Sequence, residues 1–183
     1  MTNKVLWITR TAVFIALLVA AQFFSASLGN QYVTGSLVNL ILVVSVLTCG
    51  ISAGVTVAVL SPVFAFLVGA GPMFPPLIPF IMAGNAVLVL IWFAFDVGAG
   101  PTEPGRRYKG FFYAAPVAAA AVKALALYGG VVLIAIPHLL HLAAPQAAMI
   151  TLMFSFPQFI TALVGGVIAL VIAPRVKKAV KIH

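Results

Sequence analysis

The feature that most constrains this chain is a series of six long apolar runs, separated by short breaks rich in glycine, proline and polar residues. Each run is long enough to cross the roughly 30 Å hydrocarbon core of a bilayer as a helix. Because a segment in lipid must satisfy its own backbone hydrogen bonds, each span should be α-helical. The runs cover residues 6–28, 33–49, 51–70, 75–96, 111–136 and 147–173. The sequence therefore predicts an all-α integral membrane protein whose residues 1–183 form a single six-helix transmembrane domain.

The residue composition agrees with a chain surrounded by lipid. Hydrophobic residues make up 64% of the sequence and charged residues only 7%, whereas soluble domains carry about 25% charged residues. No polar stretch is long enough to fold as a separate soluble domain. Cys49 is the only cysteine, which excludes an internal disulfide and a metal cluster held by several thiolates.

The placement of basic residues predicts the topology. Most of them lie near the N-terminus, in 106–109 and in 175–181, and six spans put all three groups on one side. The loops on the other side, 29–32, 70–74 and 137–146, contain no Lys or Arg. By the positive-inside rule both termini are cytoplasmic, in a multi-pass protein of the cell membrane. The basic groups form no patch interleaved with aromatic residues, so no nucleic-acid partner is expected.

The first run has a second interpretation. Residues 1–28 contain basic residues, then the apolar stretch AVFIALLVAAQFF, then Ser25-Ala26-Ser27, and this order is also that of a signal peptide with its cleavage site. The apolar stretch is long for a signal peptide, and Gln22 lies awkwardly near the site. Cleavage would leave five spans.

A lysine interrupts the fifth run. Lys123 lies within AAAAVKALALYGGVVLIAI, where a charge at the helix centre costs about 2.5–3.5 kcal/mol even on the mildest scale. Asn39, Asn85 and Gln158 come from other spans and fall at a similar depth, while Tyr128 adds a hydroxyl further outward. These five residues are the candidate substrate-binding residues.

The amides alone could simply bond neighbouring helices. The lysine is harder to explain, because no span contains an Asp or Glu that could pair with it. An unpaired lysine either loses its proton or keeps its charge in a water-filled cavity. We therefore expect Lys123 to face a cavity that receives an anionic or carbonyl-rich ligand.

The chain carries no signature of an enzyme. It has no HExxH or GxSxG sequence, no pair of intramembrane carboxylates and no nucleotide-binding loop, so we expect no catalysis and no cofactor. His138 and His141 are three residues apart and could ligate a metal, but an interfacial position on a short loop helix is the preferred interpretation, and no metal site is predicted. Without intramembrane carboxylates, proton-coupled transport is also disfavoured, so transport would need energy from a partner.

A stripe of small residues lies on the first span. Ala12, Ala16 and Ala20 are spaced by four and therefore share one face of a helix. Such faces let another helix approach closely, either within the same protein or from a partner. The stripe begins at the cytoplasmic end of the span, which favours a partner.

These features together resemble a known family. Six spans in a chain of this size, the Ala12/Ala16 motif, the segment GSLVNLILVVSVLTCGISAGVTVAVLSPVFAFLVG and the ending FSFPQFITALVGGVIALVIAPRVKKA are similar to the substrate-binding S component of an energy-coupling factor (ECF) transporter. The resemblance covers nearly the whole chain and implies the S-component bundle, in a prokaryotic plasma membrane.

The resemblance implies a division of labour among the helices. Helices 4 to 6 and the outer loops would bind a vitamin or related micronutrient, and helices 1 to 3 would dock on a transmembrane coupling subunit driven by two cytoplasmic ATPases. ATP would be used by those partners only. Carried over to this chain, Ala12 and Ala16 would meet the coupling subunit. The pocket would be lined by Asn85, Lys123, Tyr128 and Gln158, with Asn39 beside it.

The residues also limit the substrate. Lys123 favours a carboxylate, another phosphate-free anion or a ring carbonyl, and aromatic rings such as Phe74 and Tyr32 could stack on a planar ligand. A carboxylated vitamin or a heteroaromatic precursor therefore fits. Two other functions stay open, a structural or assembly subunit of a membrane complex and a stand-alone carrier of small solutes.

Overall fold

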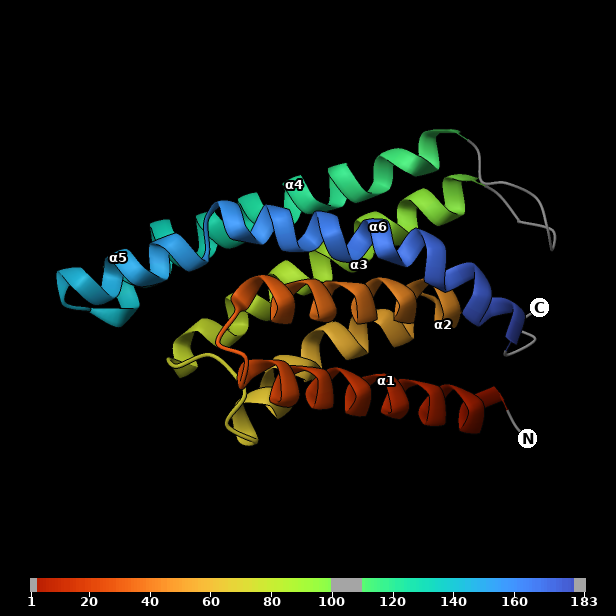
Figure 1. Cartoon of the computed structure of the whole chain (residues 1–183), viewed down its shortest axis with the longest axis horizontal. Coiled ribbons are helices and arrows are strands. Elements are labelled where there is room, and N and C mark those ends of the chain that lie inside the picture. The colour runs from red at the N-terminus through yellow and green to blue at the C-terminus, as the bar shows by residue number, and fades with distance from the viewer. Residues whose placement is uncertain (1–2, 100–109, 180–183) are drawn as a thin grey trace.

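Helices joined by short connections make up the described part of the protein, residues 3–99 and 110–179 of a computed structural model, and this part contains no strand (Figure 1). The elements are α1 (Asn3–Ala26), α2 (Gln31–Leu67), η1 (Pro75–Leu77), α3 (Ile78–Ala99), η2 (Gly110–Ala114), α4 (Ala115–Leu127), η3 (Tyr128–Leu140), α5 (Ala144–Met153) and α6 (Phe156–Ala179). Short 3₁₀ turns form η1 and η2, and η3 is a π-helix. The predicted all-α class is confirmed for these residues.

Five helical stretches of the described residues are long and apolar enough to cross a membrane. They are Lys4–Ala26, Gln31–Leu67, Pro75–Gly98, Phe112–Leu140 and Ala144–Ala179. Each overlaps one of the six predicted runs over most of its length, except the second, which overlaps the two runs that meet at Cys49 and Gly50.

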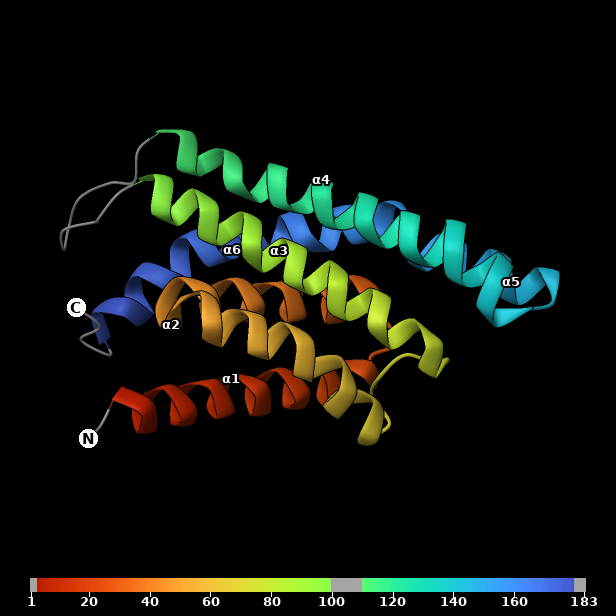
Figure 2. The same ribbon diagram turned by 180° about the vertical axis from the view of Figure 1, so that it is seen from behind.

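The helix α2 bends back on itself at Gly50. This residue has φ 82° and ψ 177°, a backbone conformation that is essentially restricted to glycine. The chain reverses direction there, so that a first arm (31–49) and a second arm (51–67) run side by side in opposite directions (Figures 1 and 2). The arms touch directly beyond the bend, where a Cβ on Gly54 would lie 2.7 Å from the Cβ of Val46. The sequence break at 49–50 thus separates two helical arms within one long stretch.

We expect Gly50→Ala to destabilise the protein through the backbone alone. A Cβ at this position would meet nothing within 4 Å, so the substitution creates strain but no clash. Holding a residue in such a conformation costs on the order of 1–3 kcal/mol, which should lower the apparent Tm of the purified protein in detergent. Gly129→Ala is the matched control, because Gly129 also faces open space and does not have a positive φ. Equal Tm values for the two variants would contradict the strain at Gly50.

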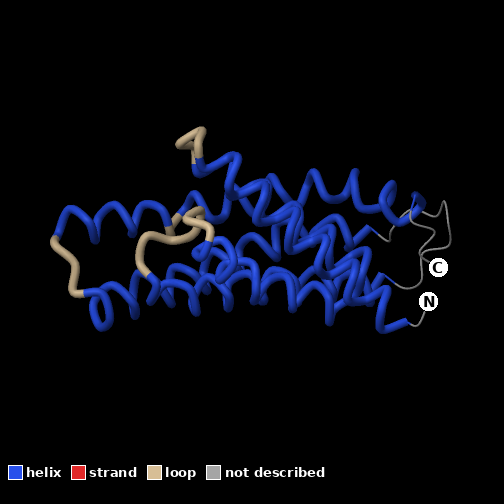
Figure 3. Tube along the Cα trace, turned by 90° about the horizontal axis from the view of Figure 1, so that it is seen from below, coloured by secondary structure: helices blue, strands red, loops and turns tan. Residues whose placement is uncertain are grey.

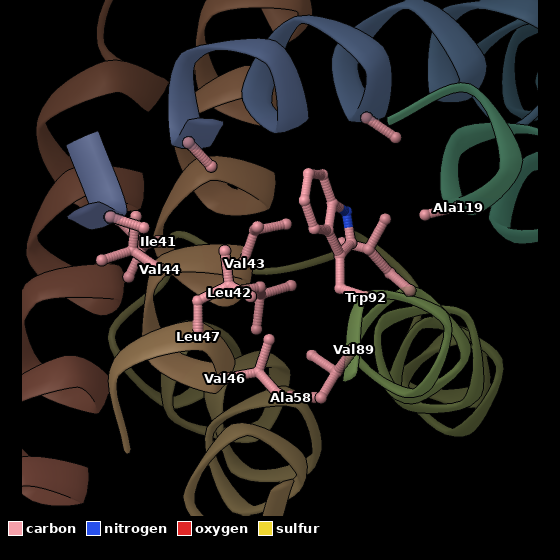
Figure 4. Packing of buried hydrophobic residues seen from close by; sticks show 14 of the residues in the cluster. Ile41, Leu42, Val43, Val44, Val46, Leu47, Ala58, Val89, Trp92 and Ala119 are labelled. Atoms are coloured by element: carbon pink, nitrogen blue, oxygen red, sulfur yellow. The ribbon is translucent and has the colours of Figure 1, made fainter. Parts of the chain in front are cut away.

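The apolar core lies where α2 meets α3, α4 and α6. The helices α3 and α6 pack against α2, α4 closes the group by packing against both of them, and α1 packs on the outside of α2. Leu42, Val43 and Val46 of α2 meet Val89 and Trp92 of α3 in this core (Figure 4). The arrangement leaves one side of α1 without a neighbour among the described helices.

The two ends of the molecule differ in charge. The beginning of α1, the bend of α2 and the end of α6 lie at one end, while the α1–α2 turn, the 68–74 segment and α5 lie at the other (Figures 1 and 3). The first end carries the described basic residues of α6, and Lys177 pairs there with Asp96 at 3.6 Å. The predicted basic group at 106–109 and Lys181 fall outside the described residues.

The α1 segment is a packed helix of the bundle. Leu18 is fully buried, and the Trp7 indole N–H donates to Ser52 Oγ at 3.0 Å on the second arm of α2. These contacts hold α1 against the second arm of α2.

The last two spans are longer than predicted and irregular. The fifth run corresponds to η2, α4 and η3, and the sixth begins inside α5 and continues through α6. The break between α5 and α6 falls at Phe154 and Ser155, just before Pro157 in the first turn of α6, where proline is tolerated. At the end away from the termini, η3 and α5 extend past the other helices (Figure 2).

Candidate ligand-binding site

The side chain of Lys123 is buried between three helices. It is 3% exposed, and its Nζ donates to Asn39 Oδ1 at 2.6 Å and to Asn85 Oδ1 at 2.8 Å. Lysine comes from α4, whereas the two asparagines come from the first arm of α2 and from α3. Asn39 is 84 positions from Lys123 in the sequence and Asn85 is 38 positions from it, yet both contact the same amine.

A second set of hydrogen bonds fixes the orientation of the Asn39 amide. Its Nδ2 donates to the Gly35 carbonyl at 2.8 Å and to Thr161 Oγ1 at 3.4 Å. The Thr161 hydroxyl in turn donates to the Gln158 carbonyl at 3.2 Å. With both donors used in this way, Asn39 can offer only its oxygen to Lys123. Asn39 of α2 therefore connects Thr161 of α6 to Lys123 of α4 through hydrogen bonds.

Lys123 is consequently not the unpaired residue that the sequence suggested. Two neutral amide oxygens hold it, and these supply hydrogen-bond acceptors but no negative charge. Within the described ranges the one ion pair is that of Lys177 with Asp96, at the basic end of the bundle. A positive charge on Lys123 would therefore be solvated by dipoles and left without a counter-ion.

A cavity of about 230 Å³ opens beside this cluster. Small-molecule sites typically measure about 300–1,000 Å³, so this one suits a small ligand. Its walls come from α1, both arms of α2, the 70–74 segment, α3, α4, α5 and α6. The α5 helix and the 70–74 segment place it toward the end away from the termini (Figure 3).

Most of the cavity wall is apolar, with a few polar groups. Leu77, Ile81, Leu127, Phe74 and Phe154 are among the apolar residues, together with three methionines. The polar residues that line it are Gln22, Gln31, Thr34, Asn39, Ser61, Asn85, Lys123 and Gln158. No Asp or Glu of the described chain lines the cavity. This is the usual make-up of a small-molecule pocket, in which few polar groups fix the orientation of a ligand.

The structure brings four of the five candidate substrate-binding residues together. Lys123, Asn39, Asn85 and Gln158 line the same cavity. Tyr128 does not line it and is 41% exposed. The reason is helical geometry, because Tyr128 follows Leu127 directly and only Leu127 turns inward.

Of the two aromatic residues considered for stacking, one reaches the cavity. Phe74 lines it from the segment before η1. Tyr32 lies near the start of α2, is 48% exposed and is not part of the wall.

Four polar residues of the cavity wall were not among the candidates, namely Gln22, Gln31, Thr34 and Ser61. Gln22 of α1 and Ser61 of the second α2 arm line the cavity, and their Oε1 and Oγ atoms are buried without a hydrogen-bond partner in the described part. Gln22 is an amide inside an apolar run, as Gln158 is, so the same criterion could have found it. Ser61 gives no comparable signal, because serine is common in membrane helices and usually bonds its own backbone.

The small-residue stripe of α1 lies outside the site. Ala12, Ala16 and Ala20 are all exposed, on the side of α1 that faces away from α2. The two histidines are exposed as well, His138 in the last turn of η3 and His141 at its end. The part of the chain that the structure describes contains no group of three residues able to hold a metal ion.

Comparison with known proteins gives no match to this chain, whether with family models, with curated proteins or with solved structures. The central features of the site are a buried lysine that has no counter-ion among the described residues and a small cavity beside it, in a bundle of helices apolar enough to cross a membrane.

Proposed function

We propose that this protein is the substrate-binding subunit of a membrane importer, of the kind that the S components of ECF transporters represent. It would bind a vitamin or related micronutrient in the cavity beside Lys123. It would then dock on a transmembrane coupling subunit whose two cytoplasmic ATPases supply the energy.

The observation that carries this proposal is the cavity with Lys123 at its wall. A purely structural lysine would be expected to lie among packed side chains, yet Lys123 borders about 230 Å³ of open space. Charged residues inside membrane spans usually serve a binding or transport function. The lack of a counter-ion suits a site whose ligand brings the negative charge.

The proposed topology has six spans. The two antiparallel arms of α2 would cross the membrane separately, and both termini would lie in the cytoplasm with the basic residues of α6. The cavity lies toward the opposite end and would face the outside. A substrate could then enter from outside before the complex forms.

The exposed face of α1 supports the docking step. The helix α1 makes its one extensive contact with α2, and its exposed side carries a shallow stripe formed by Ala12, Ala16 and Ala20. A second candidate function, a structural subunit of a membrane complex, would use the same stripe. It would leave the cavity without a role, so the two functions differ in whether a small molecule binds.

The docking step predicts separate effects of interface and cavity substitutions. We expect the double variant Ala12→Leu, Ala16→Leu to lose the co-purifying coupling subunit and ATPases while it keeps its ligand. Overpacking of a close helix contact costs about 1–3 kcal/mol, or roughly 5- to 140-fold in affinity. The measurement is quantitative mass spectrometry of subunits that co-purify with the tagged protein from its native membrane.

Ala83→Leu is the control for this experiment, because Ala83 is an exposed alanine on α3 and not part of the stripe. The control should retain the partners. If the double variant retains the coupling subunit and ATPases as the control does, the stripe is not the docking face. If the wild-type protein co-purifies with no ATPase, the importer proposal fails.

A further inference from the structure

We infer that Gln22 and Ser61 form a second polar subsite of the cavity, and that the ligand is a small carboxylic acid carrying an N–H or O–H donor away from its carboxylate. This inference rests on the proposed function, because it takes the cavity as the ligand site. It adds the chemical class of the ligand and a contact from α1.

The subsite around Lys123 offers only donors. Lysine as an ammonium has three N–H groups, and two of them go to Asn39 Oδ1 and Asn85 Oδ1. The third has no partner among residues 3–99 and 110–179, and neither does the Nδ2 group of Asn85. Since both amide oxygens are already used, a ligand group here must be an acceptor. Two adjacent donors, one of them charged, match the two oxygens of a carboxylate.

The subsite formed by Gln22 and Ser61 needs the opposite kind of group. Gln22 Oε1 is an acceptor, buried and without a partner in the described structure, and Ser61 Oγ is in the same situation on a residue only 1% exposed. Leaving a buried polar atom unsatisfied costs about 1–3 kcal/mol, and most buried polar atoms have a partner. Gln22 and Ser61 both line the cavity, so a ligand there can supply the missing partner.

The hydroxyl of Ser61 differs from those hydroxyls of α2 that bond the backbone of their own helix. Thr48 and Thr56 of the same helix donate to the carbonyls four residues earlier, at 2.7 and 2.8 Å. Ser61 makes no such bond and borders the cavity. Its hydroxyl is therefore available to a ligand, as acceptor or as donor.

The two subsites together exclude other ligand classes. A cation would be repelled by Lys123 and would find no carboxylate among the described lining residues. A plain fatty acid would satisfy Lys123 but leave the Gln22 oxygen unpaired. The mostly apolar lining of the cavity suits a compact organic body. A small acid with a distal hydroxyl, amide or ring N–H satisfies all three conditions.

The position of Gln22 has a consequence for the transport step. It lies on α1, the same helix that exposes the alanine stripe. The resemblance to S components assigns ligand contacts to the later helices. A ligand held by Gln22 would instead bridge α1 to α4 and link occupancy of the cavity to the position of the docking helix.

The test measures binding of defined acids by thermal stabilisation and calorimetry of the full-length protein in detergent. The probes are metabolite carboxylic acids, each compared with its uncharged primary amide and with the analogue whose distal donor is methylated. One such set is para-hydroxyphenylacetate, para-hydroxyphenylacetamide and para-methoxyphenylacetate. For the tightest acid we expect both analogues to bind at least about tenfold more weakly.

Two substitutions then test whether the distal donor of the ligand contacts Ser61 and Gln22. Ser61→Ala and Gln22→Leu should each weaken that acid about three- to tenfold and leave the donor-methylated analogue unaffected. Ser45→Ala and Gln146→Leu are the controls, a buried serine of α2 and a glutamine of α5, both outside the cavity wall.

The outcomes separate this inference from the proposed function. If an acid binds but Ser61→Ala and Gln22→Leu change nothing, the second subsite is wrong and the cavity remains a ligand site. If amides bind as well as acids, the carboxylate assignment is wrong. If no probe binds and the purified protein carries no small molecule, the proposed function itself is overturned.

Discussion

Replacing Lys123 with methionine is expected to weaken ligand binding strongly and also to destabilise the fold. Methionine resembles the lysine stem in length but cannot donate, so Asn39 Oδ1 and Asn85 Oδ1 would remain buried without a partner. Each orphaned oxygen costs about 1–3 kcal/mol, and we expect the two to lower the free energy of unfolding by roughly 2–6 kcal/mol. The apparent Tm in detergent measures this loss. Ligand affinity should fall by roughly 10- to 100-fold, because the lost contact is a charged one.

A triple variant separates the two effects of Lys123. In Asn39→Leu, Asn85→Leu, Lys123→Met all three polar groups are replaced by apolar groups of similar size, which removes the orphaned oxygens. Such replacements can be nearly neutral for stability. We expect the triple variant to recover most of the Tm that Lys123→Met loses, but not the ligand. A triple variant that unfolds like the single one would mean that the cluster is needed for the fold itself.

The second large effect is expected at Gly165 of α6. A Cβ on this residue would lie 2.7 Å from Leu40 N, 2.7 Å from Ser36 O and 2.8 Å from Asn39 Cβ, all on the first arm of α2. Two of these atoms belong to the backbone and cannot rotate away. Gly165→Ala must therefore push α6 and α2 apart, at a cost of about 1–3 kcal/mol.

The displacement at Gly165 should also reach the ligand site. Asn39 lies at the point of contact and holds Lys123, so Gly165→Ala should lower both the apparent Tm and the ligand affinity. Val167→Leu adds a methylene on the exposed side of the same helix and should change neither. A normal Tm and normal affinity for Gly165→Ala would contradict the close packing of α6 on α2.

Hydropathy predicted the helices well, because the apolar runs and the breaks between them are long and distinct. The break predicted at Cys49 and Gly50 is also where the chain reverses, although both runs belong to the one helical stretch Gln31–Leu67 and a single glycine with a positive φ makes the turn. The ends of the last two spans were missed. Apolar residues continue through η3 and α5, so the pattern gave no sign that these elements extend beyond the bundle.

The sequence was enough to predict most of the residues proposed for the site, but not the hydrogen bonds that they make. Depth along each span was enough to group Lys123 with Asn39, Asn85 and Gln158, since polar residues at one level of a bundle tend to meet. The same reasoning failed for Tyr128, because depth says nothing about which side of a helix faces inward. The two amide oxygens that hold Lys123 depend on side-chain rotamers and helix packing, which a single sequence does not specify.

The most direct test of the account is mass spectrometry of the small molecules released from the gently purified protein, wild type beside the triple variant. We predict that the wild-type protein releases a near-stoichiometric carboxylic acid with a distal N–H or O–H group, and that the triple variant, folded by its Tm, releases none. A triple variant that carries the same molecule, or a wild-type protein that carries none and is stabilised by no acid of the probe panel, would contradict a ligand site at Lys123.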